Sequence, residues 1–249
     1  MGAGLTRRRG ERRLPRAFYR RPSHLVAPDL LNKVLVVGDR AGRIVEVEAY
    51  AGSDDRASHA HRGPTARNAT MFGPPGHLYV YFTYGMHWCA NAVTSEPGTA
   101  GAVLIRALEP LRGVDAMAAA RPAARRAIDV ANGPAKLCEA LGLDGRADGA
   151  DLTTADRSIT IVDDTTPPPD HPATGPRVGI SVATETPWRF WVPGHPHRSP
   201  AGPAGSGRRT ALLRRPGGVG VARRRPRLDR AHAAGWRRRA EHAAVPGRF

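Results

Sequence analysis

Apolar and polar residues alternate along several segments, most regularly from residue 42 to residue 50. In an extended chain, three small apolar side chains there point one way and two acids and a tyrosine point the other: Val45, Val47 and Ala49 against Glu46, Glu48 and Tyr50. The usual interpretation of such a strand is that its polar side faces water. The polar loop that follows, 51–68, favours instead a functional role for this polar side, because catalytic groups collect in loops beside strand ends.

A second alternating region predicts a β-hairpin. Residues 77–84 and 87–94 have strand patterns, and Gly85-Met86 between them marks the reversal. Tyr79 and Tyr81 share one face of the first strand, and Tyr84 falls at the tip. An aromatic at a tip can pack on a neighbouring loop, or it can act as a wedge, as in proteins that insert side chains between base steps of DNA.

The remaining pattern predicts a single α+β domain on a curved, mostly antiparallel β-sheet with a few flanking helices. A helix over 134–141 is indicated by Asn132-Gly-Pro134 at its start and Gly142 at its end. The predicted strands are 33–37, 42–50, 78–84, 87–94, 101–107, 159–163, 177–183 and 188–193, and the other predicted helices are 28–32 and 110–121. A chain of 249 residues allows one such domain, at 22–197, with a basic flexible arm over 1–21 and a tail over 198–249.

Charge is concentrated in the predicted tail. Residues 198–249 hold 14 arginines against Asp229 and Glu241, a net charge of +12, whereas residues 1–197 hold 24 basic and 20 acidic residues, a net charge of +4. The tail is rich in Arg, Gly, Pro and Ala without a periodic apolar face. Two interpretations stay open: a disordered tail that adds non-specific DNA affinity, or out-of-frame translation of a GC-rich gene.

Aromatic residues are concentrated between Glu48 and Asn91. This stretch holds seven of the fourteen aromatics of the chain and four of its five tyrosines. A tyrosine has a flat apolar face and a polar tip, so a group of them suits a slot that stacks on a flat polar ligand. A carboxylate beside such a slot suggests chemistry on that ligand.

Several motifs in this order resemble the alkyladenine (3-methyladenine) DNA glycosylase family of vertebrates and bacteria. The resemblance runs roughly from Leu25 to Pro196. The motifs are Arg43-Ile-Val-Glu-Val-Glu-Ala-Tyr50, Asp54-Asp-Arg-Ala-Ser-His59, Arg67-Asn-Ala-Thr-Met-Phe72, Pro75-Gly-His-Leu-Tyr-Val-Tyr-Phe-Thr-Tyr-Gly-Met86, Leu104-Ile-Arg-Ala-Leu-Glu-Pro110, Gly133-Pro-Ala-Lys-Leu-Cys138 and Arg177-Val-Gly-Ile180. After Pro196 the resemblance stops abruptly.

The resemblance implies a role for each matching residue. Glu48 matches the general base that activates water, and Arg106 and the backbone carbonyl of Val178 match groups that hold this water. The residues implied to surround an extruded base are Tyr50, His59, Tyr81 and Asn91, the last of which disfavours the amino group of normal guanine. Tyr84 matches the side chain that fills the gap in the duplex, and DNA contacts are expected from Arg62, Arg67, Met71 and Lys136. Because the net charge of residues 1–197 is small, we expect DNA binding by the domain to depend on a local basic patch near Arg43, Arg62, Arg67, Arg106 and Lys136.

The residue inventory fits a monofunctional glycosylase that hydrolyses the N-glycosidic bond of damaged purines. Such an enzyme must flip the base out of the duplex, which costs least for a damaged base. A cationic alkylpurine gains a cation–π interaction of about 1–2 kcal/mol in an aromatic slot. It is also a good leaving group, so one carboxylate can suffice where most sugar-cleaving enzymes need two.

Other mechanisms and partners are disfavoured. Lys33 and Lys136 are the two lysines, and neither aligns with the tyrosines as a Schiff-base lyase requires. Two cysteines cannot hold an iron–sulfur cluster, and the histidines lack zinc-finger or zincin spacing, so we expect no cofactor and no metal. The expected partner is double-stranded DNA containing damaged purines, with no membrane, for a cytoplasmic, nucleoid-associated bacterial monomer.

Two other functions stay open. A catalytically inactive nucleic-acid-binding protein would use the aromatic slot and the arginine-rich tails, but it has no use for a buried acid at position 48. A small-molecule enzyme on a related fold would not need Tyr84 at a hairpin tip.

Overall fold

The computed structural model describes residues 10–200. Its strands are β1 (Arg12–Arg13), β2 (Val34–Val37), β3 (Arg40–Ala51), β4 (Leu78–Thr83), β5 (His87–Thr94), β6 (Gly101–Arg112), β7 (Ile159–Asp163), β8 (Ala173–Gly175) and β9 (Arg189–Trp191). Its α-helices are α1 (Arg16–Tyr19), α2 (Ser23–Leu30), α3 (Val114–Ala119) and α4 (Pro134–Leu141). Single 3₁₀ turns cover Gly52–Asp54, Ala69–Phe72, Ala127–Asp129, Gly145–Ala147 and Asp156–Ser158.

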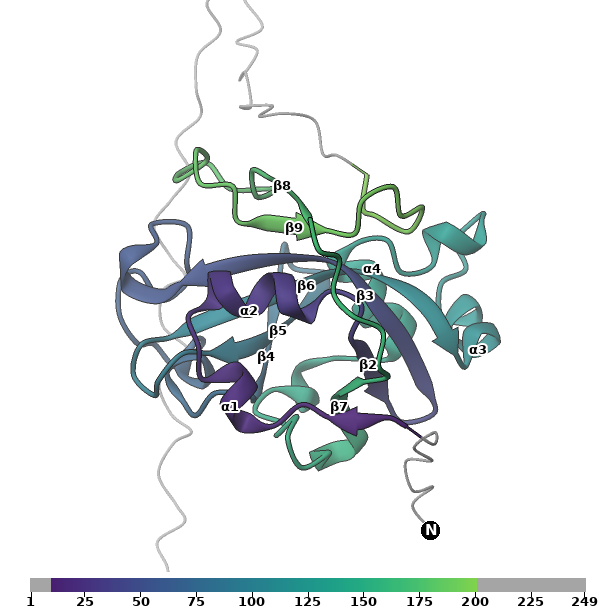
Figure 1. Cartoon of the computed structure of the whole chain (residues 1–249), viewed down its shortest axis with the longest axis horizontal. Helices are drawn as coiled ribbons and strands as arrows, with labels where there is room; N and C mark the ends of the chain where they lie inside the picture. The colour runs from purple at the N-terminus through teal and green to yellow at the C-terminus, as the bar shows by residue number, and fades with distance from the viewer. Residues whose placement is uncertain (1–9, 201–249) are drawn as a thin grey trace, which may run out of the picture. The chain divides into compact units, whose positions relative to one another are not determined.

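The strands form one curled antiparallel sheet in the order β1-β7-β2-β3-β6-β5-β4 (Figure 1). The long strand β3 is paired along one edge with β6, while its other edge is shared by β2 near residues 40–43 and by β9 at residues 46–48. β8 extends the sheet beyond β9. The predicted α+β domain on a curved antiparallel sheet is therefore confirmed.

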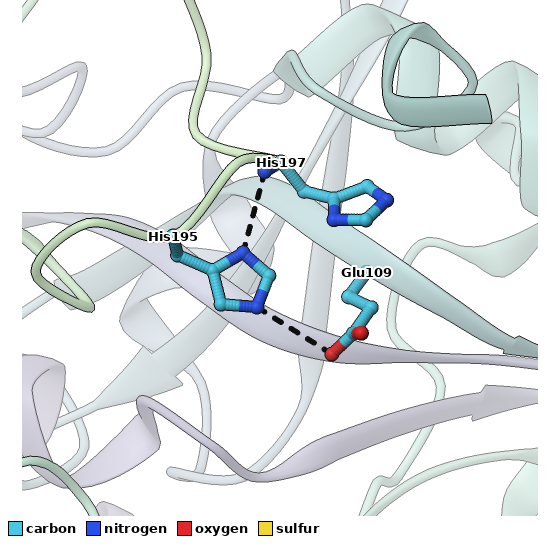
Figure 2. Close-up of side chains that lie close together, drawn as sticks. All are labelled: Glu109, His195 and His197. Carbon is cyan, nitrogen blue, oxygen red and sulfur yellow. Dashed lines mark hydrogen bonds and ion pairs between the residues drawn. The ribbon is translucent and has the colours of Figure 1, made fainter. Parts of the chain in front are cut away.

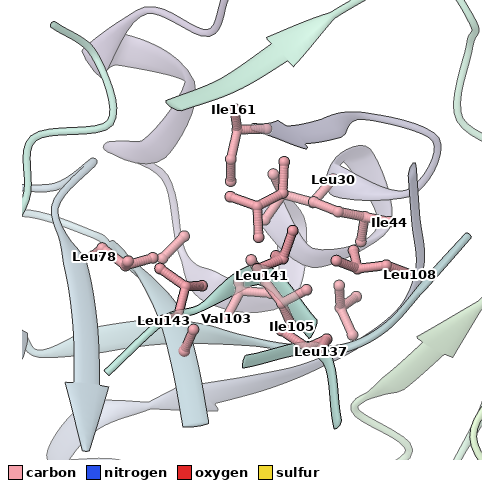
Figure 3. Close-up of a cluster of buried hydrophobic side chains, with 14 of the residues drawn as sticks. Leu30, Ile44, Leu78, Val103, Ile105, Leu108, Leu137, Leu141, Leu143 and Ile161 are labelled. Atoms are coloured by element: carbon pink, nitrogen blue, oxygen red, sulfur yellow. The ribbon is translucent and has the colours of Figure 1, made fainter. Parts of the chain in front are cut away.

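The main hydrophobic core lies between the curled sheet and the helices α2 and α4 (Figure 3). Ile105 and Leu108 of β6 pack in one cluster with Leu30 of α2 and with Leu137 and Leu141 of α4. Burial of a leucine or isoleucine side chain contributes ~1.5–3 kcal/mol, so this cluster holds the central strands in place. β3 and β6, on which the site is built, are thus both anchored in this core.

The predicted hairpin and the helix over 134–141 are confirmed. β4 and β5 pair with Thr83 opposite His87, and α4 begins at Pro134 and ends before Gly142, whose φ of +72° places it in the left-handed region. The turn is one residue earlier than predicted. Tyr84 and Gly85 occupy its two central positions, and the amide of Met86 closes it by donating to the carbonyl of Thr83 at 3.2 Å.

Other elements differ from the prediction. Residues 177–183 do not form a strand, because the amide of Val178 binds a carboxylate instead of a neighbouring strand. The helix expected over 110–121 is confined to α3, since β6 continues its pairing with β3 as far as Arg112. The helix expected over 28–32 is α2, which begins at Ser23 and has ended by Leu31.

The ends of the domain also lie elsewhere than predicted. Tyr19 is fully buried and Arg16 forms an ion pair with Asp151, so residues 12–21 pack on the domain and are not a flexible arm. Ser199 is buried as well and belongs to the domain, two residues beyond the boundary placed at 197. The rest of the predicted tail, from residue 201, lies outside the described residues, and no helix within residues 10–200 is long and apolar enough to cross a membrane.

Candidate active site

Glu48 is completely buried in β3, and three donors hold its carboxylate. Oε1 accepts the amide of Val178 at 2.7 Å and lies 3.2 Å from a guanidinium nitrogen of Arg106 on the neighbouring strand β6. Oε2 accepts the phenol hydroxyl of Tyr50 at 2.9 Å. The interpretation of Glu46 and Glu48 as the wet side of the sheet is wrong, because both are fully buried.

Burial changes the proton affinity of Glu48. Loss of solvent raises the pKa of its carboxyl above the ordinary value, against the opposing effects of Arg106, of the Val178 amide and of the Tyr50 hydroxyl. A carboxylate with a raised pKa is a stronger base than an exposed one. Glu48 is therefore suited to removing a proton from water.

Glu46 has different surroundings from Glu48. Its carboxylate accepts the amide of Ser199 at 2.7 Å and the hydroxyl of Ser199 at 2.9 Å, and Arg106 donates to it at 3.2 Å. Arg189 of β9 lies 3.6 Å away. Glu46 therefore ties the end of the described chain to Arg106, which is the one of these partners that lines the cavity.

A buried ion pair supports the ring of Tyr50 from behind. Arg177 donates to Oδ1 of Asp55 at 2.9 Å and to the carbonyl of Ala49 at 3.0 Å, and its guanidinium lies 4.7 Å from the Tyr50 ring centre. Both charges are inaccessible to solvent, so removal of either would leave the other buried and unpaired, which typically costs ~3–5 kcal/mol. The pair joins the loop after β3 to the loop that carries Val178.

A cavity of about 240 Å³ opens in front of these groups. Its walls include most of the residues that the sequence singled out, namely Tyr50, His59, Met71, Tyr81, Tyr84, Asn91, Arg106 and Val178. Cavities for drug-sized ligands measure ~300–1,000 Å³, so this one suits a single small ring system. Glu48 lies directly behind the wall, in contact with three of the residues that form it.

The aromatic side chains of the cavity contact one another. The rings of Tyr79 and Tyr81 are stacked with centres 5.3 Å apart, and His59 meets Tyr81 edge-on at 4.5 Å. Burial, followed by the charge of Arg67, lowers the pKa of His59, so its ring is neutral at neutral pH. The aromatic rings of the cavity are thus uncharged, and the charged groups beside them are Arg106 in the wall and Glu48 behind it.

Asn91 is buried opposite the tyrosines. β5 pairs Asn91 with Tyr79 on one side and with Leu104 on the other. Its side-chain amide donates to the carbonyl of Tyr79 at 3.1 Å, which fixes the orientation of the side chain at the cavity wall. The position therefore suits a residue that contacts the edge of a bound ring system and so discriminates between bases.

Tyr84 stands out from the surface at the hairpin tip, with 80% of its area exposed. Its φ of +52° lies in the left-handed region, which costs a non-glycine residue about 1 kcal/mol. Positive φ at both Tyr84 and Gly85 matches the tight turn that suits the twist of two strands. The turn thus holds an exposed aromatic ring at the rim of the cavity, at a cost in stability.

The expected DNA-binding residues differ in their exposure to solvent. Arg62 and Arg67 are exposed, and Arg67 also donates to the carbonyl of Phe82 at 2.7 Å. Met71 is buried in the cavity wall, where it cannot face a phosphate. Lys136 is half-buried and donates to Asn132 at 2.7 Å.

The wider basic patch that we expected also included Arg43 and Arg106. Arg43 is paired with Asp164 at 2.8 Å, and Arg106 is buried between Glu46 and Glu48. Neither guanidinium is available to DNA, so the exposed cations of the expected patch are Arg62 and Arg67.

Sequence reasoning missed three residues of this site. Asp55 and Arg177 belong to motifs that carried the resemblance, but nothing in their spacing indicates that they pair across 122 residues. Ser199 follows the point where the resemblance stopped, so no motif indicated it. A pair of acids two apart on a strand, as in Glu46 and Glu48, is the one local signal that buried cationic partners are needed.

The sequence matches one family model and many known proteins. The family model for methylpurine-DNA glycosylase matches residues 17–196. A protein of Burkholderia lata is 60% identical over 183 residues, which cover 73% of this chain and 88% of that protein. Proteins of Streptomyces avermitilis and Methanocella arvoryzae are each 47% identical, over 75% and 72% of this chain and 91% of their own lengths. All three are named, provisionally, 3-methyladenine DNA glycosylase.

These matches define the class of protein as a DNA glycosylase. The chain belongs to the methylpurine-DNA glycosylase family.

Proposed function

We propose that this protein is a monofunctional DNA glycosylase that flips damaged purines out of duplex DNA and hydrolyses their N-glycosidic bond with a water activated by Glu48. The observation that carries the proposal is the completely buried carboxylate of Glu48, with raised pKa, directly behind an aromatic cavity. A protein that only binds nucleic acid gains nothing from the cost of burying this charge.

The bonds of Glu48 favour one position for the attacking water. A carboxylate has about four acceptor sites, two on each oxygen. Val178 and Arg106 occupy Oε1, whereas Tyr50 is the one donor to Oε2 among the described residues. A water bound to the open site of Oε2 would transfer its proton to Glu48 as its oxygen attacks the sugar carbon, while the base leaves with the bonding electrons.

A base that stacks in the cavity must lie beside the contacting rings of His59 and Tyr81 and not between them. A planar ring needs roughly 3.5 Å on each side, about 7 Å between two rings that enclose it. The ring centres of His59 and Tyr81 are 4.5 Å apart and the rings meet edge-on, so the base would occupy the cavity that both rings and Tyr50 line. We propose that alkylated purines, which carry positive charge, gain most from this slot because its rings are neutral and Glu48 is near.

Tyr84 completes the proposed mechanism. Its ring is exposed at the rim of the cavity, and it would enter the duplex and fill the space that the flipped nucleotide leaves. Arg62 and Arg67 would hold the flanking phosphates. Substrates that we propose on this basis are 3-methyladenine and other alkylpurines, hypoxanthine and ethenoadenine.

The test uses duplex oligonucleotides with one lesion each: an alkylated purine, hypoxanthine or ethenoadenine. Incubation with the full chain, followed by hot alkali, cleaves the strand wherever a base has been excised. We expect cleavage that depends on alkali, because a monofunctional enzyme leaves the abasic site intact. Absence of excision on every lesion would contradict the proposal, and strand breaks without alkali would indicate a lyase.

A further inference from the structure

Three side chains that could bind a metal converge away from the aromatic cavity. His195 and His197 belong to the segment after β9, and Glu109 belongs to β6 (Figure 2). One nitrogen of each histidine and a carboxylate oxygen of Glu109 all lie within 4.8 Å of one another. Nε2 of His195 is 3.5 Å from Oε2 of Glu109.

We propose that Glu109, His195 and His197 form a binding site for a divalent transition-metal ion, with zinc as the best match. Two imidazoles and one carboxylate are a common donor set for zinc, with bonds of ~2.0–2.2 Å and water at the fourth position. Tetrahedral geometry at these lengths places donor atoms roughly 3.4 Å apart. The donor atoms lie within 4.8 Å of one another, so each pair must approach by ~1.4 Å at most to bind the metal. This inference is independent of the proposed function.

The backbone prepares the two histidines for this role. Gly194 has a φ of +69°, and the amide of His195 closes the turn by donating to the carbonyl of Val192 at 3.3 Å. Pro196 fixes φ between the two histidines, which lowers the entropy cost of ordering them. Nδ1 of His197 is buried and has no hydrogen-bond partner among the described residues, so no protein contact competes with a metal ion for this atom.

Two neighbouring contacts must adjust when the metal enters. Nδ1 of His195 accepts the amide of His197 at 3.3 Å, which leaves the proton on Nε2. Binding through Nε2 needs the other neutral tautomer, so this long hydrogen bond opens. Arg43 lies 3.9 Å from Glu109, but its main partner is Asp164 at 2.8 Å, so it does not occupy the carboxylate.

The position of the site gives the metal a structural role. It would join β6 to the chain immediately before Ser199, whose amide and hydroxyl hold Glu46. Metal binding would therefore fasten the last segment of the domain over the buried charges behind the cavity. No sequence motif indicated this site, because Glu109 is remote in the chain from the two histidines.

The test is titration of the full chain, freed of metal with EDTA, with zinc by calorimetry and with cobalt(II) by visible absorption. We expect one zinc ion per chain with a Kd below about 10 µM, a tetrahedral cobalt spectrum and a higher melting temperature with zinc. Glu109→Gln keeps the shape of the side chain and should weaken binding by about 10-fold or more. His195→Ala with His197→Ala should abolish the cobalt spectrum.

His171→Ala is the matched control, because His171 is exposed and apart from the site, and it should bind zinc as the unaltered chain does. Absence of saturable binding at about 100 µM zinc overturns the proposal. So does a cobalt spectrum that survives the double histidine substitution. If that variant does not fold, Glu109→Gln decides the question, and unchanged zinc affinity in it likewise overturns the proposal.

Discussion

The amide of Val178 donates a 2.7 Å hydrogen bond to Oε1 of Glu48, across 130 residues of chain. The sequence resemblance implied that the carbonyl of Val178 holds the attacking water, and that role stays a prediction. The structure shows that the amide of the same residue contacts the carboxylate of Glu48, the proposed general base. One loop residue can thus set both the position of Glu48 and the geometry of the water in front of it.

Glu48→Gln should lose most single-turnover excision, by about 100-fold or more, because an amide cannot accept the proton of water. Binding to lesion-containing duplex should survive, since the cavity wall and Tyr84 are unchanged. The measurement is single-turnover excision beside a fluorescence binding assay on the same oligonucleotide. Full excision by Glu48→Gln would exclude Glu48 as the general base.

Tyr50→Ala and Tyr81→Ala should each weaken binding to lesion duplex by ~1–3 kcal/mol, the usual value for loss of one base–aromatic stack. Binding to undamaged duplex should change little, because no flipped base occupies the cavity there. The ratio of the two dissociation constants separates the alternatives. Equal loss on both duplexes would show that these rings support the fold and do not stack on a base.

Tyr84→Asn should raise stability and lower lesion affinity together. Asparagine tolerates the left-handed conformation that Tyr84 adopts at φ +52°, so we expect a gain of about 1 kcal/mol in the free energy of unfolding. Tyr84→Phe is the control, since it keeps the ring and the strain. Chemical denaturation and lesion binding are the two measurements, and unchanged lesion affinity in Tyr84→Asn would argue against the wedge.

The pH profile of excision should show that Glu48 acts as a carboxylate. Excision should fall as the pH decreases through the pKa of Glu48, which burial raises above its ordinary 4.5. Arg106 lowers this pKa, so Arg106→Gln should raise it further and move the acidic limb to higher pH, whereas Arg106→Lys should largely keep it. An N7-alkylated purine is the right substrate, because it leaves without added protonation. An acidic limb that does not move would mean that another group controls it.

A pair of truncated chains separates the tail from the domain. A chain ending at Pro200 keeps Ser199 on Glu46 and should excise at the full rate, whereas a chain ending at His197 lacks both bonds to Glu46 and should be less stable. Both should bind undamaged DNA more weakly than the full chain. Log affinity falls with log salt, and each phosphate that the shorter chains no longer neutralise makes this dependence shallower by ~0.9. Equal stability of the two chains would show that Ser199 contributes nothing.

Local patterns predicted what neighbours in the chain determine. The β4–β5 hairpin follows from alternation and one glycine, and α4 follows from Pro134 and Gly142. The site depended instead on pairs that no periodicity encodes. Asp55 with Arg177 and Glu46 with Ser199 are joined across more than a hundred residues, and their burial converts an expected wet strand face into a charged interior. Residues 177–183 have a strand's composition, yet their polar groups bind acids on β3 and in the loop after it.

The register of the hairpin separates two tasks that evolution can change independently. Tyr79 faces Asn91 and Tyr81 faces Cys89 near the base of the strand pair, whereas Tyr84 lies beyond Thr83 and His87, the last paired residues. Insertions or substitutions at the tip can therefore change Tyr84 and its turn without moving the tyrosines of the aromatic cavity. A single-residue insertion below Tyr81 would instead turn the tyrosines to the opposite face of the sheet. Relatives should accordingly differ in length and sequence at the tip and keep a fixed spacing beneath it.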